Sequence, residues 1–360
     1  MHLFTVGPVE MSNEIKAIGG QQVPYFRTKE FSEIMLDSDR LLKKFMNAGN
    51  NAKSVYLTAS GTGAMEATVI NCLNKEDNVL VINGGTFGHR FVQLCKIHEI
   101  PHQIIQLAAN ETLTYNHLTK YEESGITALL VNINETSTGQ LYDIGILSDF
   151  CKRNHAYLIV DAISSFLIDP YDMLKHNVDA TIISSQKGLC IAPGLSVVVL
   201  SERIINEKIT NNNVKNLYFN FKDYMTDFQR GQTPFTPCVG TCLEMHKALQ
   251  LVAKMSLPAF LEKIDLVAKD FRKKITTLPV RIPDFPLGNA VTPIIFDKPI
   301  AKIVFEILKN KYGLIVNPTG GASENYVLRV AHIGNTTTED NSMLIEKMVC
   351  AITEAENQNE

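Results

Sequence analysis

The sequence contains no uncharged apolar run that approaches the ~18 residues needed to span a membrane. Its first residues, MHLFTVGPVEM, lack the charged segment and apolar run of a secretory signal peptide. A block of basic residues is also missing, and 34 Lys and Arg against 38 Asp and Glu give a net charge of −4. We therefore expect neither a membrane protein nor a dedicated nucleic-acid-binding protein.

Cysteine is scarce, and the seven residues in 360 are scattered and odd in number, which argues against a disulfide framework. Cys238 and Cys242 are four residues apart, but no second Cys or His pair has the spacing of a zinc site. We expect no bound metal and a cytoplasmic location. The length and the 45% hydrophobic content are those of a globular protein of about two domains, at ~150 residues each.

The middle of the chain alternates apolar strand-like runs with helix-like segments. Seven strands are expected: Ser54–Ala59, Asn78–Ile82, His102–Leu107, Ala128–Asn132, Ala156–Asp161, Ala180–Ser184 and Ser196–Leu200. The helices between them are expected at Gly63–Leu73, Gly88–Glu99, Asn116–Ser124 and Asp143–Asn154. Strands rich in Val, Ile and Leu that alternate with helices predict an α/β fold, with a mostly parallel sheet flanked by helices on both faces.

The pattern changes after Pro258, where a long amphipathic stretch leads into a proline-rich connector. The segments that follow predict a smaller α+β domain: helices at Phe260–Thr276, Ile300–Tyr312 and Thr338–Glu354, and strands at Ala290–Phe296, Leu314–Val316 and Tyr326–Ala331. We expect a large domain of residues 16–257 and a small domain of residues 258–360 that also includes residues 1–15.

Ligands of open α/β sheets bind beyond the carboxyl ends of the strands. Five segments at such ends carry residues with chemical potential: Ser60–Glu66, Asn83–Gly88, Asn134–Gly139, Asp161–Ser165 and Ser184–Gly188. The first could hold an anion on the free N–H groups of a helix start, or could be only a tight turn. It is neither a Walker loop nor a full dinucleotide fingerprint.

Each of the other segments also has two interpretations. Phe87 could stack on a flat ring or belong to the core beneath a glycine-rich turn. The polar loop at Asn134–Gly139 could bind a ligand or simply form a capped turn. Asp161 closes a buried strand and must be paired or solvated; a helix cap or a metal ligand are the alternatives. Lys187 could be an ordinary surface lysine, or a desolvated nucleophile with a lowered pKa.

The combination is more informative than any one segment. Pyridoxal phosphate requires a lysine for its Schiff base, a carboxylate at its pyridine nitrogen and a cradle for its phosphate. Lys187, Asp161 and the small-residue turn at Ser60–Glu66 supply these groups on successive strand ends of one expected sheet. A cofactor of this kind is therefore predicted.

The sequence resembles the class V, fold type I, pyridoxal-phosphate aminotransferases. Within this family it is similar to alanine–glyoxylate, serine–pyruvate and 2-aminoethylphosphonate–pyruvate transaminases. The resemblance extends from Gly7-Pro8-Val9 to Arg329 and beyond. Its anchors are Ser60–Ala64, Glu135–Gly139, Asp161–Ser164, Ser185-Gln186-Lys187 and Thr236-Pro237. It implies a homodimer with active sites at the subunit interface.

The resemblance also implies a role for each matching residue. Lys187 would form the Schiff base and later move the proton at the substrate Cα, and Asp161 would bind the pyridine nitrogen. The remaining cofactor contacts that it implies are Phe87 on the ring, Thr136 at the ring hydroxyl, Thr62, Gly63, Ala64 and Gln186 at the phosphate, and Thr236 at the phosphate of the neighbouring subunit.

For the substrate, the resemblance places Arg329 at the carboxylate, where its planar fork suits a bidentate contact. Arg27 and Arg230 are further cations that could bind a second acidic group such as a phosphonate, although arginines of this kind more often lie on the surface. His332 could face the substrate or belong to the edge of the core. Ala64 departs from the family pattern, because some relatives have histidine there.

The leading hypothesis is a transaminase that moves an amino group from 2-aminoethylphosphonate, alanine or serine to pyruvate, glyoxylate or a similar acceptor. A lyase or a cysteine desulfurase on the same fold is the alternative. Desulfurases, however, have a histidine before the lysine, where this chain has Gln186. A third possibility, a cofactor-free binding protein, is disfavoured because Lys187, Asp161 and Arg329 are all present.

Overall fold

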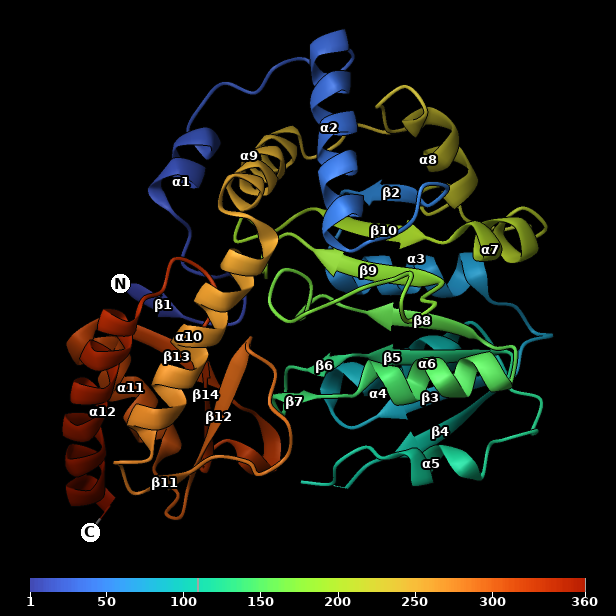
Figure 1. The fold of residues 1–360 in the computed structure, drawn as a ribbon. Helices are drawn as coiled ribbons and strands as arrows, with labels where there is room; N and C mark the ends of the chain where they lie inside the picture. Colours follow the sequence, from blue (N-terminus) through green and yellow to red (C-terminus); the bar gives the residue numbers. More distant parts are fainter. Residues whose placement is uncertain (109, 360) are drawn as a thin grey trace.

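The computed structural model describes residues 1–108 and 110–359, which contain two main sheets (Figure 1). The larger sheet has seven strands in the order β2-β10-β9-β8-β5-β3-β4. Their bounds are β2 (Lys53–Leu57), β3 (Val79–Asn83), β4 (His102–Gln106), β5 (Ala128–Asn132), β8 (Tyr157–Asp161), β9 (Ala180–Ser184) and β10 (Ser196–Leu200). All neighbours are parallel except β10, which is antiparallel to β2 and β9. The expected seven-stranded, mostly parallel sheet is confirmed.

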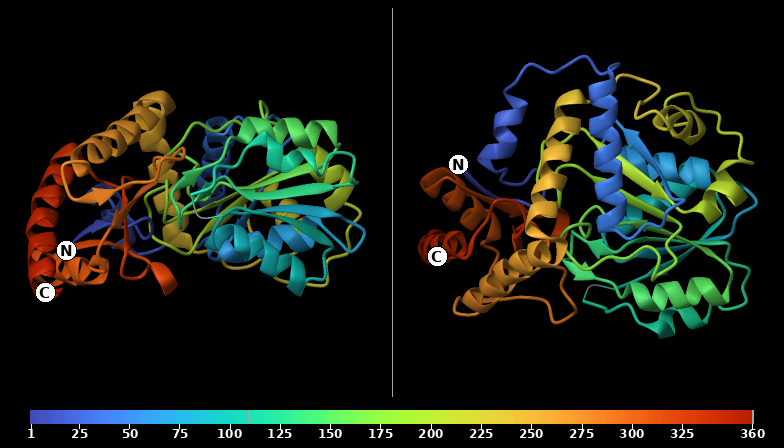
Figure 2. Two further views of the ribbon diagram at one scale, coloured as in Figure 1. Left: turned by 90° about the horizontal axis from the view of Figure 1, so that it is seen from below. Right: turned by 45° about the horizontal axis from the view of Figure 1, so that its top comes forward.

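Helices cover both faces of this sheet, as the view from below shows (Figure 2). Alternate residues of a strand point to opposite faces, so Val79 and Val81 pack on one side while Leu80 and Ile82 pack on the other. The first face is covered by α3 (Gly61–Cys72), α4 (Thr86–Ile97), α7 (Glu202–Ile204) with the π-helical turn Ile205–Ile209, and α8 (Phe221–Phe228). The second is covered by α2 (Lys29–Phe45), α5 (Tyr115–Thr119), α6 (Ile144–Arg153) and α9 (Val239–Met255).

The smaller sheet has five strands in the order β1-β13-β14-β12-β11 and packs against three helices. The strands are β1 (His2–Phe4), β11 (Val280–Arg281), β12 (Val291–Phe296), β13 (Leu314–Pro318) and β14 (Val327–Ala331), and the helices are α10 (Leu257–Ile275), α11 (Ala301–Tyr312) and α12 (Thr338–Asn359). Strand β1 pairs with β13, so the N-terminus joins this α+β unit. The exact division into residues 16–257 and 258–360 stays a prediction; it falls beside the junction of α9 and α10.

Several elements differ from the expectations or were not foreseen. Helix α5 ends at Thr119, earlier than the expected Ser124. The short strands β6 (Asn134–Glu135) and β7 (Gln140–Leu141), the helix α1 (Asn13–Gly19), the 3₁₀ turn Gly321–Ser323 and the helices α2, α8 and α9 are additional. In the described part of the chain, no helix is both long and apolar enough to cross a membrane. The cytoplasmic location stays a prediction.

The parallel direction of four strands brings the loops that follow them to one edge of the large sheet. Strands β3, β5, β8 and β9 are parallel, and their last residues lie at one edge of the large sheet: Asn83, Asn132, Asp161 and Ser184. The loops after these strands therefore meet, together with the turn that begins α3. A candidate active site is expected where they meet.

Candidate active site

A cavity of about 140 Å³ opens at this edge of the large sheet. Six of the predicted site residues line it: Thr62, Phe87, Thr136, Asp161, Gln186 and Lys187. They come from five separate segments of the chain, which the fold brings together. Among the described residues, no group of three His, Cys, Asp or Glu side chains could hold a metal ion.

The start of α3 forms one wall of the cavity. Ser60 caps the helix through a hydrogen bond from the Gly63 N–H to its hydroxyl at 3.4 Å. A Cβ atom on Gly61 would come within 2.4 Å of Ile163 Cδ1, so a larger residue here would displace the end of that side chain at the cavity wall. The first-turn N–H groups and the Thr62 hydroxyl lie where a phosphate could be held.

Phe87 is held in place by a buried carboxylate. Glu135 accepts the backbone N–H groups of Gly88 at 3.0 Å and Phe87 at 3.4 Å, at the start of α4. It is fully buried and also accepts from Asn132 at 2.8 Å and from Ser137. A negative charge at a helix N-terminus is stabilising, so Glu135 fixes the helix that presents the Phe87 ring to the cavity.

Asp161 is the last residue of β8 and is only 5% exposed. Its Oδ1 accepts the Ile163 N–H at 2.8 Å. Burial disfavours the ionised form and raises the pKa of Asp161 to about 7; the nearby Glu135 adds to this rise, whereas the Ile163 N–H and Lys187 oppose it. A carboxyl group in this state gains from a cationic partner such as a protonated ring nitrogen.

Lys187 follows β9 and is 8% exposed. Burial lowers the pKa of its amine to about 8, an effect that Asp161 opposes. Its carbonyl accepts the Cys190 N–H at 2.8 Å, which closes a tight turn. Gly7 lies directly over the side chain, because a Cβ there would be 3.1 Å from Lys187 Cδ. The result is a fixed, partly desolvated amine, the form that attacks carbonyl groups.

Two further side chains have polar groups arranged around the cavity. The hydroxyl of Thr136 donates to the Ser164 hydroxyl at 2.7 Å. The Gln186 side-chain oxygen accepts from the Ser184 hydroxyl at 2.7 Å, which leaves its NH₂ group as a donor. Both residues therefore retain hydrogen-bonding capacity for a ligand.

Arg329 lines an adjoining cavity of about 560 Å³ that shares Phe87 with the first. Its Nη1 donates to the Thr136 carbonyl at 3.1 Å and its Nη2 to the Pro318 carbonyl at 3.0 Å. The guanidinium has five N–H donors, and its Nε is buried without a partner in the described structure. Arg329 thus has free donors for an anionic substrate group.

Four other predicted residues do not line the first cavity. Gly63 lies in the first turn of α3 beside it. Ala64 is fully buried and its N–H donates to the Ser60 carbonyl at 3.1 Å, so the helix itself uses the donor that the resemblance assigned to phosphate. Thr236 is exposed and does not line this cavity. Arg27 donates to Gln232 and to the carbonyls of the Thr233-Pro234 segment instead.

The two residues whose role the sequence left open also lie elsewhere. Arg230 is exposed and pairs with Asp227 one helical turn before it. His332 is buried, and its Nε2 lies 2.7 Å from the Thr292 hydroxyl. Burial lowers its pKa well below the ordinary value. Its position agrees with a core histidine rather than a substrate contact.

Arg90 is a cavity residue that the sequence analysis missed. Its Nη1 donates to the Thr62 hydroxyl at 2.9 Å, and its guanidinium lies 4.9 Å from the centre of the Phe87 ring. It comes three residues after Phe87 in α4, so both side chains are on the same helix face. That spacing was the available signal, and it adds a cation beside the expected phosphate position.

A family model described as aminotransferase class-V matches residues 13–316. The protein belongs to this family. It is 30% identical over 350 residues to an uncharacterised aminotransferase of Helicobacter pylori strain J99, across 93% of this chain and 89% of that protein. It is 24% identical to the serine–glyoxylate aminotransferase of Hyphomicrobium methylovorum, across 92% and 85%.

Among solved structures, pyridoxamine–pyruvate aminotransferase from Mesorhizobium loti has a TM-score of 0.92 with 23% identity, across 99% of this chain and 92% of that one. That similarity supports the fold type I expectation. The class-V family depends on pyridoxal phosphate, and the residues of the cavity fit this cofactor. Among the described residues, no cation forms an ion pair with the buried Asp161 carboxyl, although Lys187 and Arg90 lie near enough to lower its pKa, so a ring nitrogen could be its direct partner. The start of α3 lines the same cavity at Ser60, Gly61 and Thr62.

Proposed function

We propose that this class-V aminotransferase binds pyridoxal phosphate through Lys187 and Asp161 and transfers the amino group of an α-amino acid, alanine or serine, to glyoxylate or pyruvate. The observation that carries the proposal is that the Asp161 and Lys187 side chains line the same cavity. Burial brings the pKa of the acid up to about 7 and that of the amine down to about 8. Opposed shifts of this kind in one cleft are typical of catalytic groups.

The roles of the protein groups follow from their chemistry. When bound, pyridoxal phosphate supplies an electron-withdrawing ring that stabilises negative charge at the substrate Cα. Asp161 would hold a proton at the ring nitrogen, and Phe87 would pack on the ring face. Lys187 would anchor the cofactor and would take and return the proton at the substrate Cα. Around them, Thr62, Gln186 and Thr136 would hold the polar edges of the cofactor, and Arg90 would add positive charge near the phosphate.

The position of Arg329 supports the proposal that the substrate carries a carboxylate. In the described residues of the two cavities, Arg329 and Arg90 are the arginines, and Arg90 is already bonded to Thr62 beside the phosphate position. Arg27 and Arg230, the cations considered for a phosphonate, are engaged by other groups of the protomer. An α-amino acid needs one such arginine, which favours alanine or serine over 2-aminoethylphosphonate.

The desulfurase alternative needs a reactive cysteine that can reach the cofactor. Within the described part of the chain, no cysteine lines either cavity. Cys190 is the nearest in sequence to Lys187, and it faces a different cavity. These positions support amino transfer over sulfur transfer.

We also propose that the protein works as a homodimer in which Thr236 reaches the partner's phosphate. Thr236 is exposed and does not line its own cavity. Light scattering should therefore give about twice the 40.1 kDa chain mass. A monomer that is fully active would contradict this arrangement.

Half-reaction spectroscopy tests the proposed function. Purified protein loaded with pyridoxal phosphate is mixed with one amine at a time, and its visible absorbance is followed as the amino group moves to the cofactor. Alanine or serine should remove the visible absorbance of the bound cofactor, and glyoxylate or pyruvate should restore it. Discharge by 2-aminoethylphosphonate alone would move the assignment to a phosphonate substrate, and release of sulfide from cysteine would favour the desulfurase.

A further inference from the structure

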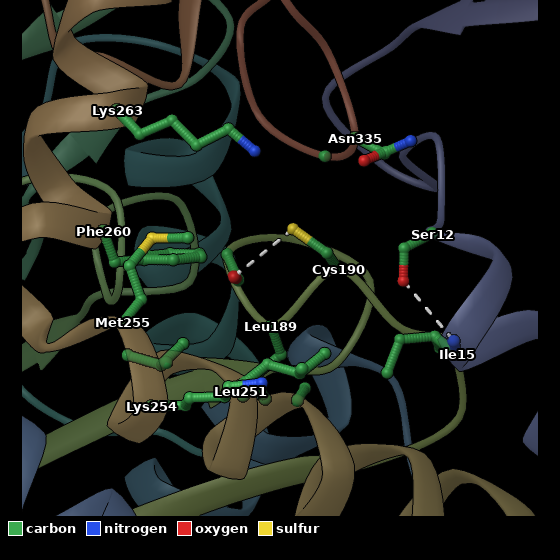
Figure 3. A pocket seen from close by; sticks show the side chains of 14 residues that line it. Ser12, Ile15, Leu189, Cys190, Leu251, Lys254, Met255, Phe260, Lys263 and Asn335 are labelled. Carbon is green, nitrogen blue, oxygen red and sulfur yellow. Dashed lines mark hydrogen bonds between the residues drawn. The ribbon is translucent and has the colours of Figure 1, made fainter.

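A separate cavity lies beside the residues that follow Lys187 in the chain, and Figure 3 shows its lining. It has a volume of about 440 Å³ and shares no lining residue with the two cavities of the candidate active site. Gly188, Leu189 and Cys190 form one wall, directly after Lys187 in the chain. A ligand here would therefore touch the active-site turn without entering the active site.

A break between two helices creates the cavity. Helix α9 ends at Met255 and α10 begins at Leu257, and Ser256 between them has a φ of +74°, in the left-handed region. The two helices therefore meet at a corner, whose inner side presents Leu251, Met255 and Phe260. Residues of the α1 segment and of the loop at Gly334 close the remaining sides.

The walls are mostly apolar and the size suits a small molecule. Aliphatic and aromatic side chains dominate the lining, including Ile15, Leu189, Leu251 and Phe260. Small-molecule pockets commonly have volumes of ~300–1,000 Å³ with apolar walls and a few polar groups. The cavity has this character, and an apolar body would gain from leaving water there.

The charged side chains among the described residues that line the cavity are all positive. They are Lys254 and Lys263, and no Asp or Glu is among these residues. In the structure of residues 1–108 and 110–359, neither Lys254 nor Lys263 forms a hydrogen bond or an ion pair, and both are exposed. Figure 3 shows the Lys263 amine extending over the cavity towards the side where Cys190 and Asn335 lie. An anionic group on the ligand would satisfy these cations.

We propose that this cavity is a binding site for a small organic anion with an apolar body, of the kind represented by a medium-chain carboxylate or an aryl sulfonate. The apolar body lies between the helix corner and Leu189, and the anionic group meets Lys263 and Lys254. The proposal does not depend on the transaminase assignment, because none of these residues belongs to the proposed catalytic site.

The ligand contacts the turn through Cys190. The Cys190 N–H donates to the Lys187 carbonyl, and the residue has a φ of +56°. Its thiol lies at the cavity wall and donates to the Gly188 carbonyl at 3.4 Å. A bound molecule therefore covers this thiol, which gives a readout that is independent of enzyme activity.

The test uses the full chain as purified, with anilinonaphthalene sulfonate as a fluorescent probe and decanoate as a competitor. Saturable binding with displacement by decanoate is expected. Lys263→Glu should raise the Kd of the probe by about tenfold, which corresponds to ~1.4 kcal/mol. Lys273→Glu makes the same charge change ten residues further along α10, ~15 Å away, and should leave binding unchanged. Equal effects of the two variants would overturn the proposal.

Two further measurements locate the probe. Leu251→Trp fills the cavity and should abolish binding, with circular dichroism to confirm that the variant is folded. In the unmodified chain, mass spectrometry should show that the probe slows iodoacetamide labelling of Cys190 severalfold and leaves labelling of the exposed Cys350 unchanged. Binding that survives in folded Leu251→Trp, or that leaves Cys190 unprotected, would place the probe elsewhere and refute the site.

Discussion

Arg329 of β14 donates a hydrogen bond to the backbone carbonyl of Thr136 at 3.1 Å, which joins the small sheet to a loop of the large one. Thr136 in turn lies in the proposed cofactor cavity. The guanidinium is therefore fixed in both position and direction, next to the cofactor site. This contact makes Arg329 a group that can orient a substrate carboxylate rather than only attract it.

Arg329→Lys should separate these two contributions. Lysine keeps the charge but loses the planar fork, and hydrogen bonds to charged groups are worth ~1.5–3 kcal/mol. We expect KM for the amino-acid substrate to rise by about tenfold or more. Arg281→Lys is the matched control, because Arg281 is an exposed residue of the same sheet that pairs with Asp297. An unchanged KM in Arg329→Lys would remove this arginine from substrate binding.

Glu135→Gln should loosen the helix that carries Phe87. The substitution removes the negative charge that accepts the Phe87 and Gly88 N–H groups. We expect a loss of about 1–3 kcal/mol in the free energy of unfolding at neutral pH and weaker cofactor binding. Urea unfolding and cofactor titration measure the two effects. Glu76→Gln, at an exposed position, should change neither; a fully stable Glu135→Gln variant would show that the carboxylate is dispensable.

Much of the fold could be predicted from sequence because the signals are local. Runs such as Tyr157–Asp161 are apolar over a strand length, and the residue after each run lies at the ligand edge of a parallel sheet. Order along the chain therefore predicts that Asp161 and Lys187 lie close together. The same order placed Phe87 and the loop that contains Thr136 at this edge, and the class-V resemblance then added their roles.

Other features depend on contacts between distant segments, and no local pattern reveals them. Arg27 is engaged by residues 232–234, more than 200 positions away. The N–H of Ala64 is used within its own helix because that helix begins at Gly61 rather than at the expected Gly63. The cavity beside the residues that follow Lys187 joins four separate parts of the chain, and the corner that forms it is a backbone turn at Ser256.

The lowered pKa of Lys187 predicts how cofactor loading depends on pH. The neutral amine is the reactive form, and with a pKa of about 8 its fraction grows as pH rises from 7 to 9. The rate at which cofactor-free protein develops visible absorbance on adding pyridoxal phosphate should increase about fivefold between pH 7 and 8 and level off above pH 9. Stopped-flow measurements provide the rates.

Asp161→Asn makes the same experiment more specific. The Asp161 carboxylate raises the pKa of Lys187, so its removal should move the midpoint of the rate profile to lower pH. Lys187→Ala should show no absorbance change at any pH, whereas Lys175→Ala, at an exposed lysine, should behave like the unmodified protein. A midpoint that stays near the ordinary lysine value of 10.5 would contradict the buried, desolvated amine.

The raised pKa of Asp161 also predicts a cost in stability for the protein without cofactor. The pKa of this carboxyl increases from 3.8 to about 7 on folding, so the folded state binds its proton more tightly than the unfolded state. This contribution is fully present below about pH 4 and is lost as pH rises towards 7. Above pH 7 the folded protein holds a buried negative charge that Lys187 and Arg90 offset only in part.

Asp161→Asn should therefore stabilise the cofactor-free protein while it abolishes most activity. Asparagine can still accept the Ile163 N–H but carries no charge. We expect a gain of about 1–3 kcal/mol at pH 8 and almost none at pH 4, measured by urea unfolding of cofactor-free samples. Asp284→Asn, at an exposed position, should show no such trend. If Asp161→Asn were the less stable protein at pH 8, the fold itself would have to stabilise the Asp161 carboxylate. The assignment of this carboxylate as the partner of a cationic ring nitrogen would then fail.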